Sequence, residues 1–248
     1  MSKPSDALRQ VYEQRGALEY AHLPDSSSAL DRKFERITEV LGRLLPCEAL
    51  LDAGCGDGRY LAALRSLGYV PPRVAGIDIA DSILATAASA TAAAGVPAEL
   101  VRANLEELPF EDEAFDVILC TQVIEHLLDP IQALRELHRV LQPGGVLLIT
   151  TDHRGNRVSR FLNGPRTMLV RLLRLRGRRR RVHFPHRDFE RDEFSGMLHA
   201  AGFSVRRIET FRFHVTDAPA AIQRLLNTVD RRLGPHGVGD ILLVVCEA

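Results

Sequence analysis

Several features that define specialised protein classes are missing from this sequence. No run of about 18 apolar residues occurs, so we expect no transmembrane helix. The four cysteines, Cys47, Cys55, Cys120 and Cys246, form no C-x-x-C pair, so the sequence predicts neither a zinc site nor a redox pair, and no bound metal. The first residues are polar and charged, which argues against a secretory signal and favours a reducing, cytoplasmic compartment.

Lysine is also scarce, and the arginines are unevenly distributed. Only 2 of the 32 basic residues are lysine, and the formal net charge is zero. Residues 153–187 contain 12 arginines and no acidic residue, which leaves 20 basic and 32 acidic residues in the rest of the chain. This separation of charge indicates a partner that carries phosphate or presents an anionic surface.

The overall amino-acid composition is that of an ordinary globular α/β protein. The chain has 248 residues, 46% hydrophobic and 26% charged, which suits one large domain. Short apolar runs alternate with segments of helical spacing, and this order predicts a parallel sheet with helices on both faces. Residues 143–145, Pro-Gly-Gly, are typical of a turn. The expected strands are 49–53, 73–78, 98–102, 115–121, 146–150, 203–213 and 241–246, and the expected helices are 30–45, 58–67, 82–94, 130–141, 192–201 and 217–233.

The most informative motif is the glycine-rich segment 50–60, Leu-Leu-Asp-Ala-Gly-Cys-Gly-Asp-Gly-Arg-Tyr. A strand ends at Asp52, and three alternating glycines lead into the next helix. A dinucleotide-binding loop would need a glycine where Arg59 stands, and its pyrophosphate would be repelled by Asp52 and Asp57. The two carboxylates suit a cationic ligand instead, and S-adenosylmethionine carries both a sulfonium and an ammonium group. Asp78 ends the next strand, where a carboxylate can bind ribose hydroxyls.

Four motifs occur in order with spacing similar to that of one enzyme family. They are the glycine loop at 51–58, Gly-Ile-Asp-Ile at 76–79, Ala-Asn-Leu-Glu-Glu-Leu-Pro-Phe at 103–110 with Phe-Asp at 115–116, and Leu-His-Arg-Val-Leu-Gln-Pro-Gly-Gly at 137–145. Through them the chain resembles the class I S-adenosylmethionine-dependent methyltransferases, in the methyltransferase type 11 group that includes ubiquinone and menaquinone biosynthesis enzymes. The resemblance covers about 50–151, with a looser match at 192–205, and implies a Rossmann-like, seven-stranded, mostly parallel sheet with an antiparallel C-terminal edge hairpin.

The resemblance also implies which residues bind the cofactor. Asp52 and Gly54 correspond to the methionine end, Asp78 to the ribose, and Asn104 and Leu105 to the adenine. Many relatives have Asp where Asn104 stands, and an amide oxygen can accept the same hydrogen bond. Simpler interpretations are that Asp52 caps the loop and Asp78 belongs to a turn. The implied cofactor-binding residues are Asp52, Ala53, Gly54, Cys55, Gly56, Gly58, Asp78, Ile79, Asn104, Leu105, Thr121, Gln122 and Val123.

Three histidines are candidates for the chemistry and for the substrate pocket. His126 follows a strand at the ligand side of the sheet, and its type of side chain suits a general base; packing beneath the cofactor is the competing interpretation. His183 and His186 follow the basic stretch, near where relatives often have a histidine over the substrate pocket. We interpret both as residues that shape this pocket.

The basic segment 160–181 combines apolar residues at helical spacing with Arg178–Arg181. Such a pattern is typical of an interfacial helix, and we hypothesise a lid that rests on anionic lipid or grips a phosphorylated substrate. A solvated surface helix is the alternative, and RNA binding is disfavoured because aromatic residues are sparse; we expect no DNA partner. The chain divides into a helical cap (1–48), the cofactor-binding core (49–151), the basic lid (152–189) and the completion of the same domain (190–248), with the cap and lid covering the substrate.

The sequence thus predicts an enzyme that moves a methyl group from S-adenosylmethionine to O, N or C of a small molecule, leaving S-adenosylhomocysteine. A hydrophobic or lipid-linked acceptor would fit a protein that is cytoplasmic or peripheral to a membrane. Two alternatives stay open. One is a non-catalytic S-adenosylmethionine-binding protein, and the other, disfavoured by Arg59 and Asp52, is a nicotinamide-dependent oxidoreductase. The methyl acceptor and the oligomeric state do not follow from the sequence.

Overall fold

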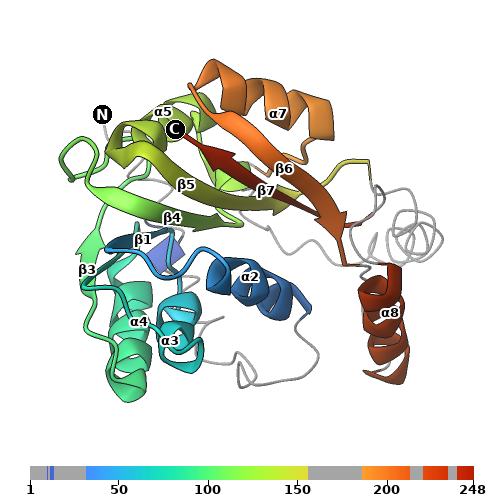
Figure 1. Ribbon diagram of the computed structural model, residues 1–248, viewed down its shortest axis with the longest axis horizontal. Helices are drawn as coiled ribbons and strands as arrows, with labels where there is room; N and C mark the ends of the chain where they lie inside the picture. The colour runs from blue at the N-terminus through green and yellow to red at the C-terminus, as the bar shows by residue number, and fades with distance from the viewer. Residues whose placement is uncertain (1–9, 11, 14–31, 156–185, 213–219, 234–238) are drawn as a thin grey trace, which may run out of the picture.

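The computed structural model describes residues 10, 12–13, 32–155, 186–212, 220–233 and 239–248 (Figure 1). Within these residues helices and strands alternate as the sequence predicts. No described helix is long and apolar enough to cross a membrane. The elements are α2 (Arg32–Gly42), β1 (Ala49–Ala53), α3 (Arg59–Ser66), β2 (Arg73–Asp78), α4 (Asp81–Ala94), β3 (Glu99–Arg102), β4 (Phe115–Thr121), the 3-10 helix η2 (Ile124–His126), α5 (Pro130–Val140), β5 (Leu141–Asp152), α7 (Arg191–Ala200), β6 (Ser204–Phe211), α8 (Ala220–Leu233) and β7 (Ile241–Glu247).

The seven described strands form one sheet in the order β3-β2-β1-β4-β5-β7-β6. The pairs from β3 through β5 are parallel, whereas β7 is antiparallel to both of its neighbours, β5 and β6. The predicted mixed sheet with an antiparallel C-terminal pair is confirmed. In the sequence, α8 and not a tight turn lies between the two strands of that pair. Because β7 is antiparallel to both neighbours, β6 runs in the same direction as β5.

Helices cover both faces of the sheet, as Figure 1 shows, and each face has its own hydrophobic core. On one face, Leu51 and Ile118 pack with residues of α5 and α7. On the other face, Leu50 and Val117 pack with residues of α2, α3 and α4. Neighbouring residues of a strand point to opposite faces, so central strands that are buried on both sides must be apolar throughout.

The predicted boundaries are confirmed for 49–53, 73–78 and 115–121, and the largest difference lies in β5. We expected a turn at 143–145 and a strand over 146–150. The observed strand instead begins at Leu141, opposite Phe115, and the next paired residue is Val146, opposite Val117. The Pro-Gly-Gly segment is therefore an irregularity within the strand, and pairing with β7 extends the strand to Asp152.

The N-terminal region meets the rest of the domain in two ways. Ile37 and Leu41 of α2 are fully buried in the core beside α3, so α2 belongs to a helical layer of the sheet. Tyr12 and Glu13 come from the segment before it and reach the edge at which the parallel strands end. There the Glu13 carboxylate accepts hydrogen bonds from the first amides of α4, Asp81 N at 2.7 Å and Ser82 N at 3.2 Å.

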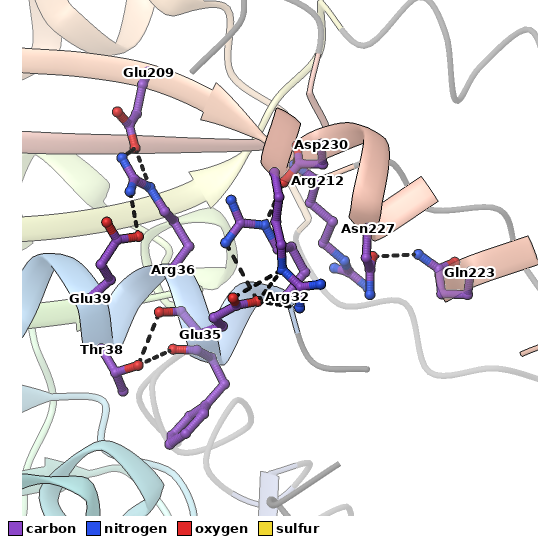
Figure 2. A network of polar contacts seen from close by, with 12 residues as sticks. Arg32, Glu35, Arg36, Thr38, Glu39, Glu209, Arg212, Gln223, Asn227 and Asp230 are labelled. Carbon is purple, nitrogen blue, oxygen red and sulfur yellow. Dashed lines mark hydrogen bonds and ion pairs between the residues drawn. The ribbon is translucent and has the colours of Figure 1, made fainter. Parts of the chain in front are cut away.

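Buried ion pairs tie α2 to the C-terminal part of the chain (Figure 2). Arg36 Nε donates to Glu209 Oε1 of β6 at 2.8 Å, and Arg32 Nε donates to Asp230 Oδ2 of α8 at 2.6 Å. The second oxygen of Asp230 accepts from the backbone amide of Arg212 at 2.7 Å. Because a buried charge is tolerated only when it is paired, these contacts fix β6 and α8 to α2.

Candidate functional site

The candidate site lies at the carboxyl edge of the parallel strands. β1, β2 and β4 end at Ala53, Asp78 and Thr121, and parallel pairing brings these ends together. In open α/β sheets ligands bind in the crevice outside these strand ends, beside the point where the strand order reverses. Here the order reverses between β1 and β4, so the glycine loop after β1 lies at that point.

Asp52 is the most unusual residue of the site. Its side chain is fully buried on β1, and neither carboxylate oxygen has a hydrogen-bond partner in the described part of the chain. Burial, followed by the negative charges of Asp78 and Asp57, raises its pKa to about 8. An unpartnered buried carboxylate is costly, whereas a cation beside it would restore the charged form. The buried Asp52 carboxylate therefore fits a positively charged ligand.

The glycines of the loop are required by backbone conformation and by contacts within the protein. Gly54, Gly56 and Gly58 have φ values of +88°, +54° and +75°, which L-residues with a side chain rarely adopt. A Cβ at Gly54 would lie 2.3 Å from Cγ2 of Val123. The amides of Gly54 and Cys55 both donate to the Ile77 carbonyl, at 2.9 and 2.7 Å. The loop is thus held against the ends of β2 and β4 by close packing.

Asp78 connects the glycine loop to the second strand. One carboxylate oxygen accepts from Gly56 N at 3.1 Å and the other from Ala80 N at 3.1 Å. Burial raises the pKa of Asp78, and the backbone hydrogen bonds oppose this shift. A carboxylate offers about four acceptor positions, so two remain for ligand hydroxyls. Asp78 is therefore both a loop-fixing residue and a candidate ribose ligand.

Asn104 and Leu105 follow β3, next to Asp78. The amide of Ala103 donates to the Asp78 carbonyl at 3.0 Å, which brings this segment to the end of β2. Leu105 is buried, and the Asn104 side-chain oxygen accepts from the amide of Glu106 at 3.2 Å. Since the amide oxygen already accepts one bond, Asn104 offers its NH2 group more freely than the acceptor role expected from the sequence.

The remaining loop residues contribute mainly through their backbones. The side chains of Ala53 and Cys55 are buried in the two cores, and burial raises the pKa of the Cys55 thiol above its usual range. Ile79 is half-buried after Asp78. Ala53 and Cys55 could therefore reach a ligand only through their backbones.

Thr121, Gln122 and Val123 bring β4 to the same edge. Gln122 has a φ of +56°, unusual for a residue with a side chain, and its amide donates to the Thr150 carbonyl at 3.0 Å. Its buried side-chain nitrogen has no hydrogen-bond partner within the described residues. Strained residues often occur at functional sites, so Gln122 is a candidate donor to a ligand. Nothing in the sequence distinguished this side chain from its neighbours.

A row of aromatic rings lies next to the end of β4. The ring centroid of His126, in η2, is 6.3 Å from that of Tyr12 and 5.2 Å from that of His186. The His186 Nε2 atom lies 3.3 Å from a carboxylate oxygen of Asp152 and 3.3 Å from one of Asp188. The structure thus brings His126 and His186 together, whereas His183 lies outside the described residues.

The group formed by Asp152, His186 and Asp188 has ligand atoms within 4.8 Å of one another, a spacing that a metal ion could bridge. Asp152 is half-buried and the other two side chains are exposed. Solvated carboxylates bind surface cations weakly, and no buried unpartnered ligand points into this group, so we assign it no metal. Its two carboxylates hold the His186 ring beside His126.

Two acidic side chains near this edge were missed by the sequence analysis as site components. Glu125 is buried, and burial raises its pKa to about 8 although it accepts a hydrogen bond from the Thr151 hydroxyl at 3.0 Å. Glu13 caps α4 from 68 residues away. Contacts so distant in sequence carry no local pattern, and Glu125 could be suspected only from its position beside His126.

Fold and site together define a Rossmann-like α/β domain whose strand ends form a site for a cationic, ribose-containing ligand. A protein family described as a methyltransferase domain matches residues 51–149. A curated relative from Mycolicibacterium smegmatis, named "Probable S-adenosylmethionine-dependent methyltransferase", is 35% identical over 174 residues, which is 70% of this chain and 59% of that protein. Residues 51–149 therefore carry a methyltransferase domain similar to that of the S-adenosylmethionine-dependent methyltransferases, a family whose cofactor is S-adenosylmethionine.

Two further similarities show how much of this chain corresponds to known proteins. The ubiquinone biosynthesis O-methyltransferase of Pseudomonas syringae pv. tomato is 34% identical over 113 residues, 45% of this chain and 47% of that protein. The chain therefore spans about half to three-fifths of these curated relatives. A crystal structure from Thermotoga maritima, titled as a SAM-dependent methyltransferase and "possible histamine N-methyltransferase", covers 97% of this chain with a TM-score of 0.63 and 19% identity. At that identity it shows the fold alone.

Proposed function

We propose that this protein transfers the methyl group of S-adenosylmethionine to a small-molecule acceptor. The observation that carries the proposal is Asp52, a fully buried carboxylate near the end of β1 that accepts no hydrogen bond from the described residues. A cationic cofactor explains why an acid is kept there, and a nicotinamide dinucleotide, whose pyrophosphate is anionic, does not. The family assignment supports the same choice.

Each part of the cofactor has a matching residue in this site. Asp52 would face the ammonium group, and the free acceptor positions of Asp78 would bind the ribose hydroxyls. Asn104 and Leu105 would contact the adenine, one through its NH2 group and the other through apolar packing. The Gln122 side-chain nitrogen would donate to the carboxylate of the methionine part.

The cofactor supplies a methyl group already activated by the positive sulfur, so the protein must mainly orient the acceptor in line with it and exclude water. The acceptor side of the site is bordered by His126, Tyr12 and His186. A hydroxyl acceptor must lose its proton; His126 would accept it, while Asp152 and Asp188 hold the neighbouring His186. Oxygen methylation accords with the O-methyltransferase names of relatives.

We further propose that the acceptor is hydrophobic or lipid-linked. The support is the sequence of the basic segment 160–181, which lies outside the described residues and whose lid role stays a prediction. His183, in the adjoining stretch, is likewise proposed to shape the acceptor pocket.

The test is a transfer assay with methyl-labelled S-adenosylmethionine and a bacterial extract, followed by partition of the label between organic solvent and water. Label in the organic phase is the expected result, and label only in water would contradict the hydrophobic acceptor. Cofactor binding without transfer to any fraction would favour a non-catalytic binding protein.

His126→Ala separates a base from a packing residue in the same assay. We expect kcat to fall by about a hundredfold or more, with cofactor affinity unchanged, because a positioned base contributes about that factor. A His126→Ala variant that loses cofactor affinity and keeps its turnover would show that His126 only packs beneath the cofactor.

A further inference from the structure

The helix α8 presents its apolar side chains outward. Among the described residues five large hydrophobic side chains are exposed, and four of them lie on α8. Their relative exposures are 47% for Ile222, 62% for Leu225, 39% for Val229 and 59% for Leu233. The spacing of three and four residues places all four in one stripe along the helix.

The polar side of the same helix is the side that faces the protein. Asn227 and Asp230 are buried, and Asp230 is held by Arg32 and by the Arg212 amide (Figure 2). Arg231 forms an ion pair with Glu35 of α2 at 2.7 Å. The usual arrangement of a surface helix, apolar side inward and polar side outward, is therefore reversed. Polar contacts fix α8 in the orientation that exposes the stripe.

The charge near this stripe has one sign. Arg232 is exposed on α8 beside the stripe, about 20° around the helix from Leu225, and the acidic residue of the helix, Asp230, is buried and paired. An apolar stripe with an arginine at its border is typical of helices that lie in the interface of an anionic bilayer. A second copy of the chain suits the stripe less well, because symmetric pairing would bring the arginines of both helices together.

The position of α8 in the fold agrees with this occupant. The last residue of β6, Phe211, and the last of β5, Asp152, both pair with Ile241. α8 therefore leaves the sheet at the carboxyl edge, the same edge as the candidate site, and Figure 1 shows it standing at the side of the molecule where β6 ends. The described residues on either side of 156–185 also lie at this edge: His153 pairs with Phe189, and His186 contacts Asp152.

We propose that α8 docks the protein on an anionic phospholipid surface, with Ile222, Leu225, Val229 and Leu233 in the apolar region and Arg232 at the headgroups. The carboxyl edge, where β6 ends, then lies next to the docked helix. Access of a lipid-dissolved acceptor to the site rests on the proposed methyl transfer, whereas docking itself does not.

The experiment measures sedimentation of the full chain with vesicles of phosphatidylcholine alone and of phosphatidylcholine mixed equally with phosphatidylglycerol. We expect binding to the anionic vesicles and little to the neutral ones. Leu225→Ser/Leu233→Ser should weaken binding about tenfold or more, since two large side chains no longer bury apolar surface. Arg232→Ser should weaken binding to the anionic vesicles and leave binding to the neutral ones unchanged.

Matched controls keep the test specific. Arg135→Ser removes an exposed arginine from α5, and Leu225→Met/Leu233→Met preserves the apolar stripe; both should bind as the parent does. Far-ultraviolet circular dichroism should be unchanged in all variants, because the altered side chains are exposed. The proposal is overturned if the parent does not bind anionic vesicles, or if the Leu-to-Ser variant binds equally well. It is also overturned if the parent is a dimer that does not bind vesicles and the Leu-to-Ser variant is a monomer. No methyl donor is present, so failure here is distinct from failure of methyl transfer.

Discussion

Asp52 and Asp230 are both fully buried aspartates, and their surroundings are opposite. Asp230 accepts from Arg32 at 2.6 Å and from the Arg212 amide at 2.7 Å. Asp52 has no hydrogen bond in the described part of the chain and has two other acids nearby, which help to raise its pKa to about 8. The difference separates a carboxylate that stabilises the fold from one that we propose faces a cationic ligand.

The same contrast holds for the two buried glutamates of these regions. Glu209 of β6 accepts from Arg36 at 2.8 Å, within the network that joins the first helix to the C-terminal strands. Glu125 accepts from a neutral hydroxyl, and burial raises its pKa to about 8. Burial alone therefore does not distinguish the two kinds of acid, whereas a hydrogen bond from a guanidinium does.

The largest expected effect is on stability, from breaking the paired acid. Asp230→Ala leaves the buried Arg32 guanidinium with only Glu35, 3.6 Å away, as an ionic partner, and we expect the free energy of unfolding to fall by about 3 kcal/mol. Urea unfolding followed by circular dichroism measures it. Arg43→Ala, which removes an exposed pair with Glu39 on the same helix, is the control and should cost less than about 1 kcal/mol. Equal losses for the two variants would contradict the assignment.

The unpaired acid should show the reverse pattern. At pH 7 a group with a pKa of about 8 is mostly protonated, so Asp52→Asn replaces a neutral side chain with another and should leave stability nearly unchanged. Loss of the charge that faces the ligand should weaken S-adenosylmethionine binding by about 1.5–3 kcal/mol. Calorimetric titration and urea unfolding together measure this. Destabilisation as large as that of Asp230→Ala would make Asp52 a structural residue.

Asp78 combines features of the paired Asp230 and the unpaired Asp52, because it fixes the glycine loop and also has free acceptor positions. Asp78→Ala should weaken cofactor binding by about 1–3 kcal/mol, since polar partners lose their acceptor. Asp78→Asn retains an acceptor and should recover part of the loss. Normal cofactor affinity in the alanine variant would argue against the ribose assignment.

The smallest effect is a pH dependence of binding. The cationic ligand favours charged Asp52, so binding lowers a pKa of about 8 and releases a proton below that pH. Affinity should therefore rise as pH increases from 6 to 8, by at most about 1.4 kcal/mol per pH unit, and level off above 8. Titration calorimetry in buffers of different ionisation enthalpy measures the released proton. An Asp52→Asn variant that keeps the slope would assign the proton to another group.

Stability without ligand should depend on pH in the opposite sense. The folded-state pKa values of Asp52 and Glu125, about 8, lie above their unfolded values, so the folded state binds more protons over the interval between. The contribution of these two groups to stability is therefore complete below about pH 4 and is lost as pH rises to about 8.

Much of the fold follows from local pattern. The apolar runs of β1, β2 and β4 and the glycines that end them are visible along the chain, and the structure confirms these boundaries. The order of β7 between β5 and β6, and the pairing that lengthens β5 to Asp152, depend on residues about a hundred positions apart. Such pairing leaves no periodic trace, so local reasoning placed the strands and not their full lengths.

The sequence by itself determined the family, the glycine loop and the acids at the strand ends, because a tight loop and a cationic ligand require particular residue types at fixed spacing. Only the tertiary structure decided that Asp52 has no hydrogen-bond partner among the described residues while Asp230 has two, and that α8 turns its apolar stripe outward. The physical reason is the same in each case. Partners such as Arg32 and Glu13 reach these elements from distant parts of the chain, and burial is a property of the packed molecule.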